Sequence, residues 1–106
     1  MNEIPLFQNK NFSVRALKEN DEIWVVAKDV ARALDYSRFD SNLIRNVPDF
    51  WKGTKRIRTF GGEQEMLCLT EQGLYFFLGR SDKPKALPYQ MWIAGDVMPS
   101  IRKASS

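Results

Sequence analysis

Apolar and polar residues alternate near the start of the chain. In residues 12–18, FSVRALK, every second residue from Phe12 to Ala16 is apolar. The turn-forming sequence ENDE follows at 19–22, and the next run, 23–26, is apolar throughout. Alternation beside a polar turn predicts a β-hairpin. The continuously apolar run predicts that its second strand is buried on both faces.

The spacing of apolar residues then changes to that of a helix. Ala27, Val30, Ala31 and Leu34 recur at the positions of one helical face, with charged residues between them. This spacing predicts an amphipathic helix over residues 27–34.

Residues 38–46 carry the signals of a second short helix. Ser37 followed by Asp40 resembles a capping box, and Pro48 opposes continuation of the helix. Two short helices in succession resemble a helix-turn-helix motif, with Asp35 where the turn favours glycine. Aspartate adopts the left-handed conformation more readily than most residues, so the turn remains feasible.

The second helix of such a motif would carry the residues that read DNA. Its exposed side chains are predicted to be Arg38, Ser41, Asn42 and Arg45. Arginine can pair with guanine, and asparagine with adenine, in the major groove. Ser41 departs from the motif, because the second helix usually buries an apolar residue there. The alternative interpretation is a helical hairpin packed on a sheet, whose polar face is merely solvated.

Residues 54–69 contain the signal of a second hairpin. A Gly61-Gly62 pair suits a two-residue turn that needs positive φ. With these glycines as the loop, Arg58 faces Glu65 across the strands, which is a favourable cross-strand pair.

Two further helices are predicted in the last third of the chain. Thr70 is a suitable N-cap for a helix that stops near Gly79. From Pro84 to Ile101 the apolar residues step by three and four, but Pro99 lies inside this pattern. A helical proline lacks a hydrogen bond and clashes with the carbonyl four residues back. We therefore expect a kinked helix or two abutting helices.

The apolar stripe of this last helix is wider than one small core usually needs. It includes Leu87, Met91, Trp92, Ala94 and Met98. The stripe either covers the core of the domain or forms a subunit interface. We predict a homodimer through this helix.

Positive charge is concentrated in the middle of the chain. The net charge of the 106 residues is +3, and the segment from Arg38 to Arg58 is the most basic part. Phosphate contacts supply affinity without sequence choice. We expect such contacts from Lys52, Lys55, Arg56 and Arg58. The alternative is a hairpin whose charges only face water, because Glu63 and Glu65 follow at once.

Several classes of protein are disfavoured by composition. The chain has no histidine, which removes His-based catalysis and His-containing metal sites. Cys68, the one cysteine, cannot form an intrachain disulfide and lies in an apolar run, so we expect a core residue in a reducing, cytoplasmic compartment. No phosphate-binding loop motif, signal-peptide pattern or apolar run of ~20 residues occurs. We expect a non-enzymatic protein without metal, cofactor or membrane span.

Three stretches of the chain resemble a known family. IWVVAKDVARALDYS, GGEQEMLCLTEQGLYFFLGRS and YQMWIAGDVMPSIRK occur in the order and spacing of the N-terminal domain of the BRO family. That domain is found in phage and prophage antirepressors and in proteins of large DNA viruses. The resemblance covers residues 12–103 and implies an α+β domain that binds DNA or another nucleic acid. In antirepressors it also implies relief of a phage repressor.

These observations combine into one expectation and one rival. We expect an α+β fold in a single domain over residues 1–106, in which small antiparallel hairpins pack with a helix-turn-helix-like pair and a kinked C-terminal helix. The leading hypothesis is a DNA-binding module of phage or prophage origin that acts in transcriptional regulation in the host cytoplasm, with RNA as the alternative nucleic acid. The rival is a module that binds a repressor or host protein without contacting DNA, through the apolar C-terminal helix and nearby aromatics such as Phe76, Phe77 and Trp92.

Overall fold

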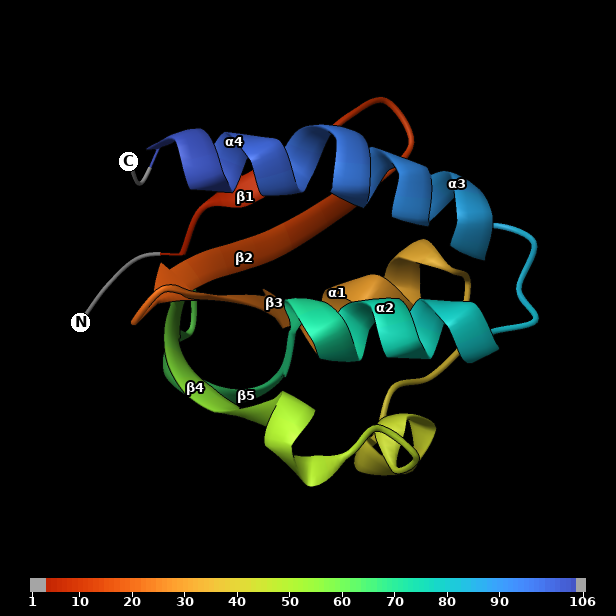
Figure 1. The fold of residues 1–106 in the computed structure, drawn as a ribbon. Coiled ribbons are helices and arrows are strands. Elements are labelled where there is room, and N and C mark those ends of the chain that lie inside the picture. Colours follow the sequence, from red (N-terminus) through yellow and green to blue (C-terminus); the bar gives the residue numbers. More distant parts are fainter. Residues whose placement is uncertain (1–3, 105–106) are drawn as a thin grey trace.

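The chain folds around one strongly curved, antiparallel sheet. The computed structural model describes residues 4–104, and its strand order is β1-β2-β3-β5-β4 (Figure 1). The five strands are β1 (Leu6–Gln8), β2 (Ser13–Glu19), β3 (Glu22–Val26), β4 (Lys52–Thr59) and β5 (Gly62–Thr70). Neighbouring strands are all antiparallel.

Helices cover one side of this sheet. They are α1 (Ala27–Ala33), the 3₁₀ turns η1 (Ser41–Ile44) and η2 (Asp49–Trp51), α2 (Glu71–Arg80), α3 (Ala86–Trp92), the π-helical turn η3 (Ile93–Val97) and α4 (Met98–Ala104). In Figure 1 the stretch from α3 to α4 runs above β2, and α2 lies below α3, which it contacts. The fold is α+β, as the sequence predicted.

The first hairpin has the predicted form. Its turn residues, Asn20 and Asp21, both have positive φ (53° and 66°), as a type I′ turn requires. Val25 on β3 is buried in the main core. On the opposite face, Val26 belongs to a small second core with Ile57 and Cys68. This strand is therefore buried on both faces, which confirms the interpretation of its continuous apolar run.

The second hairpin is confirmed, but its predicted register was wrong. Glu65 pairs with Arg56 rather than with Arg58, and Thr59 pairs with Gly62. The turn thus begins one residue earlier than predicted, on Phe60. The Thr59 hydroxyl explains the shift, because it accepts from the backbone N–H of residue 61 (3.2 Å) and donates to the carbonyl of Gly62 (2.8 Å).

Helix α1 ends at a left-handed residue, Asp35, as the sequence predicted. Asp35 adopts φ 69°, and the N–H groups of Asp35 and Tyr36 donate to the carbonyls of Arg32 and Ala31, respectively. These two bonds form a Schellman motif, in which the left-handed residue ends the helix.

The predicted second helix over 38–46 was wrong. Residues 38–40 are not helical, and η1 is a single 3₁₀ turn. Its cap is Asp40, not Ser37, because the Asp40 carboxylate accepts from the N–H of Asn42 (3.0 Å). Serine and asparagine compete with the helical backbone for hydrogen bonds, and the residue before Pro48 avoids helical φ/ψ. With no second α-helix, the helix-turn-helix interpretation does not hold.

The last third of the chain follows its sequence signals closely. The Thr70 hydroxyl accepts from the N–H of Gly73 (3.1 Å), so Thr70 is the N-cap of α2, as predicted. The C-terminal helix is kinked, also as predicted, by the π turn η3 that directly precedes Met98 and Pro99. A π turn widens the helical ladder, which gives a proline ring room that a regular helix lacks.

A buried ion pair ties α1 to the sheet. Asp29 on α1 is only 6% exposed and accepts from the backbone N–H, Nε and Nη2 of Arg15 on β2, at 2.9, 2.9 and 2.8 Å. The paired carboxylate raises the pKa of the Arg15 guanidinium. Because three donors of one residue bind this carboxylate, the pair fixes the position of α1 over β2.

Candidate nucleic-acid interface

A cleft of about 230 Å³ opens between the η1 segment and the end of α2. Its apolar wall includes Tyr36, Leu43, Phe76 and Phe77. The hydroxyls of Tyr36 and Ser81 lie 2.9 Å apart and join the two sides of the cleft by a hydrogen bond. The cleft is therefore a fixed feature of the surface, held by packing and by this bond.

Cations surround the cleft. The guanidinium of Arg80 lies over the ring of Phe76 (5.2 Å to the centroid), and Nζ of Lys83 lies over the ring of Tyr36 (4.8 Å). Arg45 lies in the sequence between Ile44 and Asn46, which both line the cleft. Such cation–π contacts orient a charged group without neutralising it.

These cations keep their charge available to a partner. Within residues 4–104, Arg38, Arg45, Arg80 and Lys83 form no ion pair with a carboxylate. By contrast, Lys85 nearby is paired with Asp35 (2.9 Å). An unpaired group of cations beside an aromatic cleft favours an anionic partner that carries planar rings.

The four residues predicted to read DNA lie on the same segment of the chain as Leu43 and Ile44, which line the cleft, although not on an α-helix. Arg38, Ser41, Asn42 and Arg45 all lie on the surface, on η1 or directly beside it. The short 3₁₀ turn presents them as a loop rather than as the face of a recognition helix.

The predicted phosphate contacts of the β4–β5 ribbon have other partners. Nζ of Lys52 donates to the carbonyl of Ile44 (3.1 Å), so Lys52 holds η1 in place and is largely buried. Lys55 pairs with Glu19 and covers the ring of Trp24 (4.2 Å).

The shift in register moves the cross-strand ion pairing from Arg58, where it was predicted, to Arg56. Arg56 pairs with Glu63 and Glu65 at 3.6 and 3.7 Å, whereas Arg58 is exposed and, in the part of the chain described, has no ion pair. Arg58 lies six residues beyond Lys52 on β4, or about 20 Å at ~3.3 Å per residue. The ribbon is thus mostly neutralised, and its free cation lies far from the cleft.

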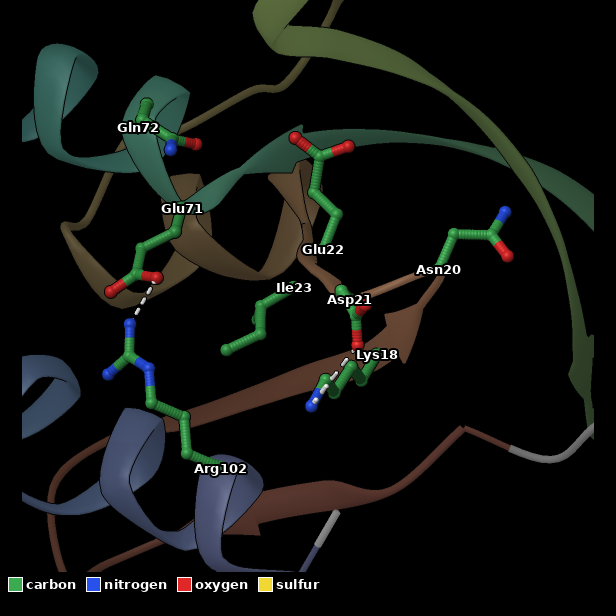
Figure 2. A pocket seen from close by; sticks show the side chains of 8 residues that line it. All are labelled: Lys18, Asn20, Asp21, Glu22, Ile23, Glu71, Gln72 and Arg102. Carbon is green, nitrogen blue, oxygen red and sulfur yellow. Dashed lines mark hydrogen bonds and ion pairs between the residues drawn. The ribbon is translucent and has the colours of Figure 1, made fainter. Parts of the chain in front are cut away.

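A second, larger hollow of about 500 Å³ lies between the turn of the first hairpin and the start of α2. Figure 2 shows its two ion pairs, Arg102 with Glu71 and Lys18 with Asp21. Among residues 4–104, no group of three or more His, Cys, Asp or Glu side chains could hold a metal ion.

The predicted subunit interface is only partly on the surface. Trp92 and Met98 are buried in the main core (8% and 0% exposed), so their assignment to an interface was wrong. Leu87 and Met91 are exposed (65% and 66%), as is Ala94. The helix bends around the core, which draws part of the stripe inward.

Sequence reasoning missed Arg80 and Lys83, and it named Phe76 and Phe77 only as a candidate protein-binding surface. Phe76 and Arg80 are four residues apart on α2, the spacing at which two helical side chains meet. That spacing was a usable signal. The proximity of α2 to η1 had no local signal, because it depends on how the sheet curves.

Together, the fold and the cleft define an α+β domain with a basic cleft that has an aromatic wall. The chain belongs to the BRO family: residues 13–99 match the model of the BRO family N-terminal domain. It is 33% identical over 102 residues to an uncharacterized protein of Haemophilus influenzae, covering 92% of this chain and 49% of that protein. The chain thus spans about half the length of this relative. No solved structure matches it.

Membership in this family is consistent with a DNA-binding regulatory module. In the described part of the chain, no helix combines the length and apolar character needed to cross a membrane.

Proposed function

We propose that this domain binds duplex DNA as a regulatory module and that the cleft and its surrounding cations form the binding surface. The observation that carries the proposal is the group of unpaired cations at the cleft. Arg80 lines the cleft, Lys83 lies over the ring of Tyr36 in its wall, and Arg38 and Arg45 are close in sequence to residues that line it. No carboxylate of residues 4–104 forms an ion pair with any of the four. Phosphate is the commonest anion that such a group binds in a DNA-binding domain.

The roles of the residues follow from their chemistry. Arg80 and Lys83 are held against aromatic rings and suit phosphate contacts, which position a protein on the duplex. Asn42 and Arg45 on the η1 loop suit base edges, because their side chains can form paired hydrogen bonds with adenine and guanine.

A salt titration of binding to random duplex DNA tests this proposal. Four phosphate contacts give a slope of log K against log salt of about −3.6. The double variant Arg80→Ala, Lys83→Ala should reduce the slope by about 2. Arg56→Ala is the matched control, since that arginine is paired within the ribbon. Absence of duplex binding at low salt, or a slope that only the control changes, would contradict the proposal.

More specifically, we propose that the protein acts as an antirepressor of phage or prophage type. A second route to that role needs no DNA, because the domain could bind a repressor protein through α3. The specific observation is the exposed pair Leu87 and Met91, one helical turn apart. The same pair is the remaining basis for the predicted homodimer.

These protein contacts have their own test. Leu87→Asp with Met91→Asp should abolish capture of the repressor, or convert a dimer to the monomer mass in light scattering. Unchanged DNA binding by this variant would separate the two routes. A monomer mass for the unaltered protein at micromolar concentration would refute the homodimer.

A further inference from the structure

A row of three aromatic side chains, exposed at its outer end, lies next to the cleft. We call Phe50, Trp51 and Phe76 the aromatic row; its ring centroids are 5.2 Å apart for Phe50–Trp51 and 5.8 Å apart for Trp51–Phe76. Arg80 stacks on Phe76 at the inner end. At the outer end Phe50 is 74% exposed. An exposed phenylalanine forgoes the burial energy that it would gain in a core, so its position requires an explanation.

The turn that presents Phe50 is rigidly held. A Cβ on Gly73 would lie 2.5 Å from the carbonyl oxygen of Trp51, so η2 packs directly against the backbone of α2. The buried hydroxyl of Thr70 donates to the same carbonyl (3.4 Å). The N–H of Trp51 donates to the carbonyl of Pro48 (2.9 Å). Phe50 is therefore a pre-positioned wedge with Trp51 and Phe76 packed behind it.

The charges around Phe50 suit DNA. Lys52, two residues away, holds η1 and its Arg45 at the edge of the cleft through the carbonyl of Ile44. The carboxylate of Asp49 opposes phosphate here, but Nζ of Lys52 lies 3.7 Å from it and offsets its charge. The wedge thus lies at the edge of the proposed binding surface rather than on a separate face.

We propose that Phe50 inserts between adjacent base pairs of the bound duplex and kinks it. This inference rests on the proposed DNA binding and specifies its mode. Proteins that insert an apolar side chain into a base step unstack that step and bend the duplex by about 20–90°. The bend brings more of the duplex onto the protein, which offsets the cost of unstacking. Trp51 and Phe76 behind Phe50 resist its displacement as the bases press on it.

The chain offers a matched control. Phe60, at the tip of the β4–β5 ribbon, is even more exposed than Phe50, but no aromatic ring of residues 4–104 packs against it. The same substitution at Phe60 removes an exposed ring from a position remote from the cleft.

The experiment measures binding and bending on one probe. A duplex of about 20 base pairs with a central TA step, a step that kinks easily, carries a fluorescence donor and acceptor at its ends. Energy transfer is followed as the full chain is added, and the unaltered protein should raise the transfer efficiency. Phe50→Ala should bind with little rise, Phe50→Leu should retain it because leucine also acts as a wedge, and Phe60→Ala should behave like the unaltered protein.

A second probe tests the unstacking step. A single central mismatch lowers the cost of opening the stack, so the unaltered protein should prefer the mismatched duplex by about tenfold. Phe50→Ala should lose this preference. Equal thermal unfolding midpoints of the variants establish that the substitutions act on binding and not on folding.

The outcomes separate this inference from the proposed function. Binding without bending overturns the wedge and leaves DNA binding intact. Bending by Phe50→Ala, or equal loss of bending in Phe60→Ala, also overturns the wedge. Failure to bind either duplex overturns both proposals.

Discussion

The ribbon β4–β5 and the cleft are both basic, but most cations of the ribbon are paired with carboxylates, whereas those at the cleft are not. On the ribbon, antiparallel pairing places Arg56 against two glutamates, and Lys55 folds onto Trp24 beside Glu19. At the cleft, Arg45 and Arg80 come from distant segments and meet no carboxylate in the described chain. A dense run of cations in a sequence thus yields less available charge than a few cations that the fold gathers.

The largest expected effect comes from disrupting the contact between η2 and α2, beside the cleft. Gly73→Ala should destabilise the domain by about 3 kcal/mol, because its methyl group would meet the Trp51 carbonyl at 2.5 Å. Urea unfolding measures this loss. The matched control is Gly79→Ala on the same helix, where a Cβ meets nothing within 4 Å. It should stabilise the domain by about 0.5 kcal/mol. Equal effects of the two substitutions would contradict a tight η2–α2 contact.

A direct comparison of the two regions comes from removing cations. Arg45→Ala with Arg80→Ala should weaken duplex binding by about tenfold or more, since both lose unpaired charge from the proposed surface. Arg56→Ala with Lys55→Ala should weaken it far less, because these cations already face glutamates. Fluorescence anisotropy at fixed salt gives both values. A greater loss from the ribbon pair would assign the binding surface to the ribbon.

Two tyrosines allow the hydrogen bonding at the cleft to be compared with that in the core. The Tyr36 hydroxyl is hydrogen-bonded to Ser81, whereas that of Tyr89, buried in the core, has no hydrogen-bond partner among residues 4–104. Burial, aided by the charge of Asp29, raises the pKa of the Tyr89 phenol. Tyr36→Phe should cost about 1 kcal/mol and Tyr89→Phe should gain about 1 kcal/mol. Thermal unfolding of the two variants checks the opposite signs.

The smallest effect concerns Cys68, which is buried on strand β5 of the ribbon. Burial raises the pKa of its thiol to about 12, from 9.0. Its folded pKa lies above the unfolded one, so the contribution to stability is present below pH 9 and is lost as pH rises toward 12. The stability difference between the unaltered protein and Cys68→Ala should therefore narrow above about pH 9. Alkylation at mildly alkaline pH as fast as that of a free thiol would show that the ribbon opens readily.

Features set by local chemistry could be predicted from the sequence. Asp35 takes the left-handed conformation, Thr70 caps α2, and the helix kinks ahead of Pro99. Each depends on one residue and its immediate neighbours. The same holds for the first hairpin, whose turn sequence and flanking apolar residues agree.

Features that depend on competition between alternative hydrogen bonds, or on contacts between distant elements, could not be predicted in the same way. The Thr59 hydroxyl moved the second turn by one residue, and weak helix formers before Pro48 left η1 as a 3₁₀ turn. Lys52 and Lys55 found partners on other elements. No spacing along the chain reveals those partners, because they meet only after the sheet has curved.

The π turn η3 has a consequence for the length of the chain. A π turn holds one more residue than an α-helical turn between the same two ends. The extra residue is absorbed within Ile93–Val97, so the helix before and after it still faces the core with Tyr89 and Met98. This stretch is therefore the place in the C-terminal helix where one residue can be gained or lost without rotating α4 away from the core. In design terms, it is a built-in spacer between two halves of a helix whose contacts are otherwise fixed.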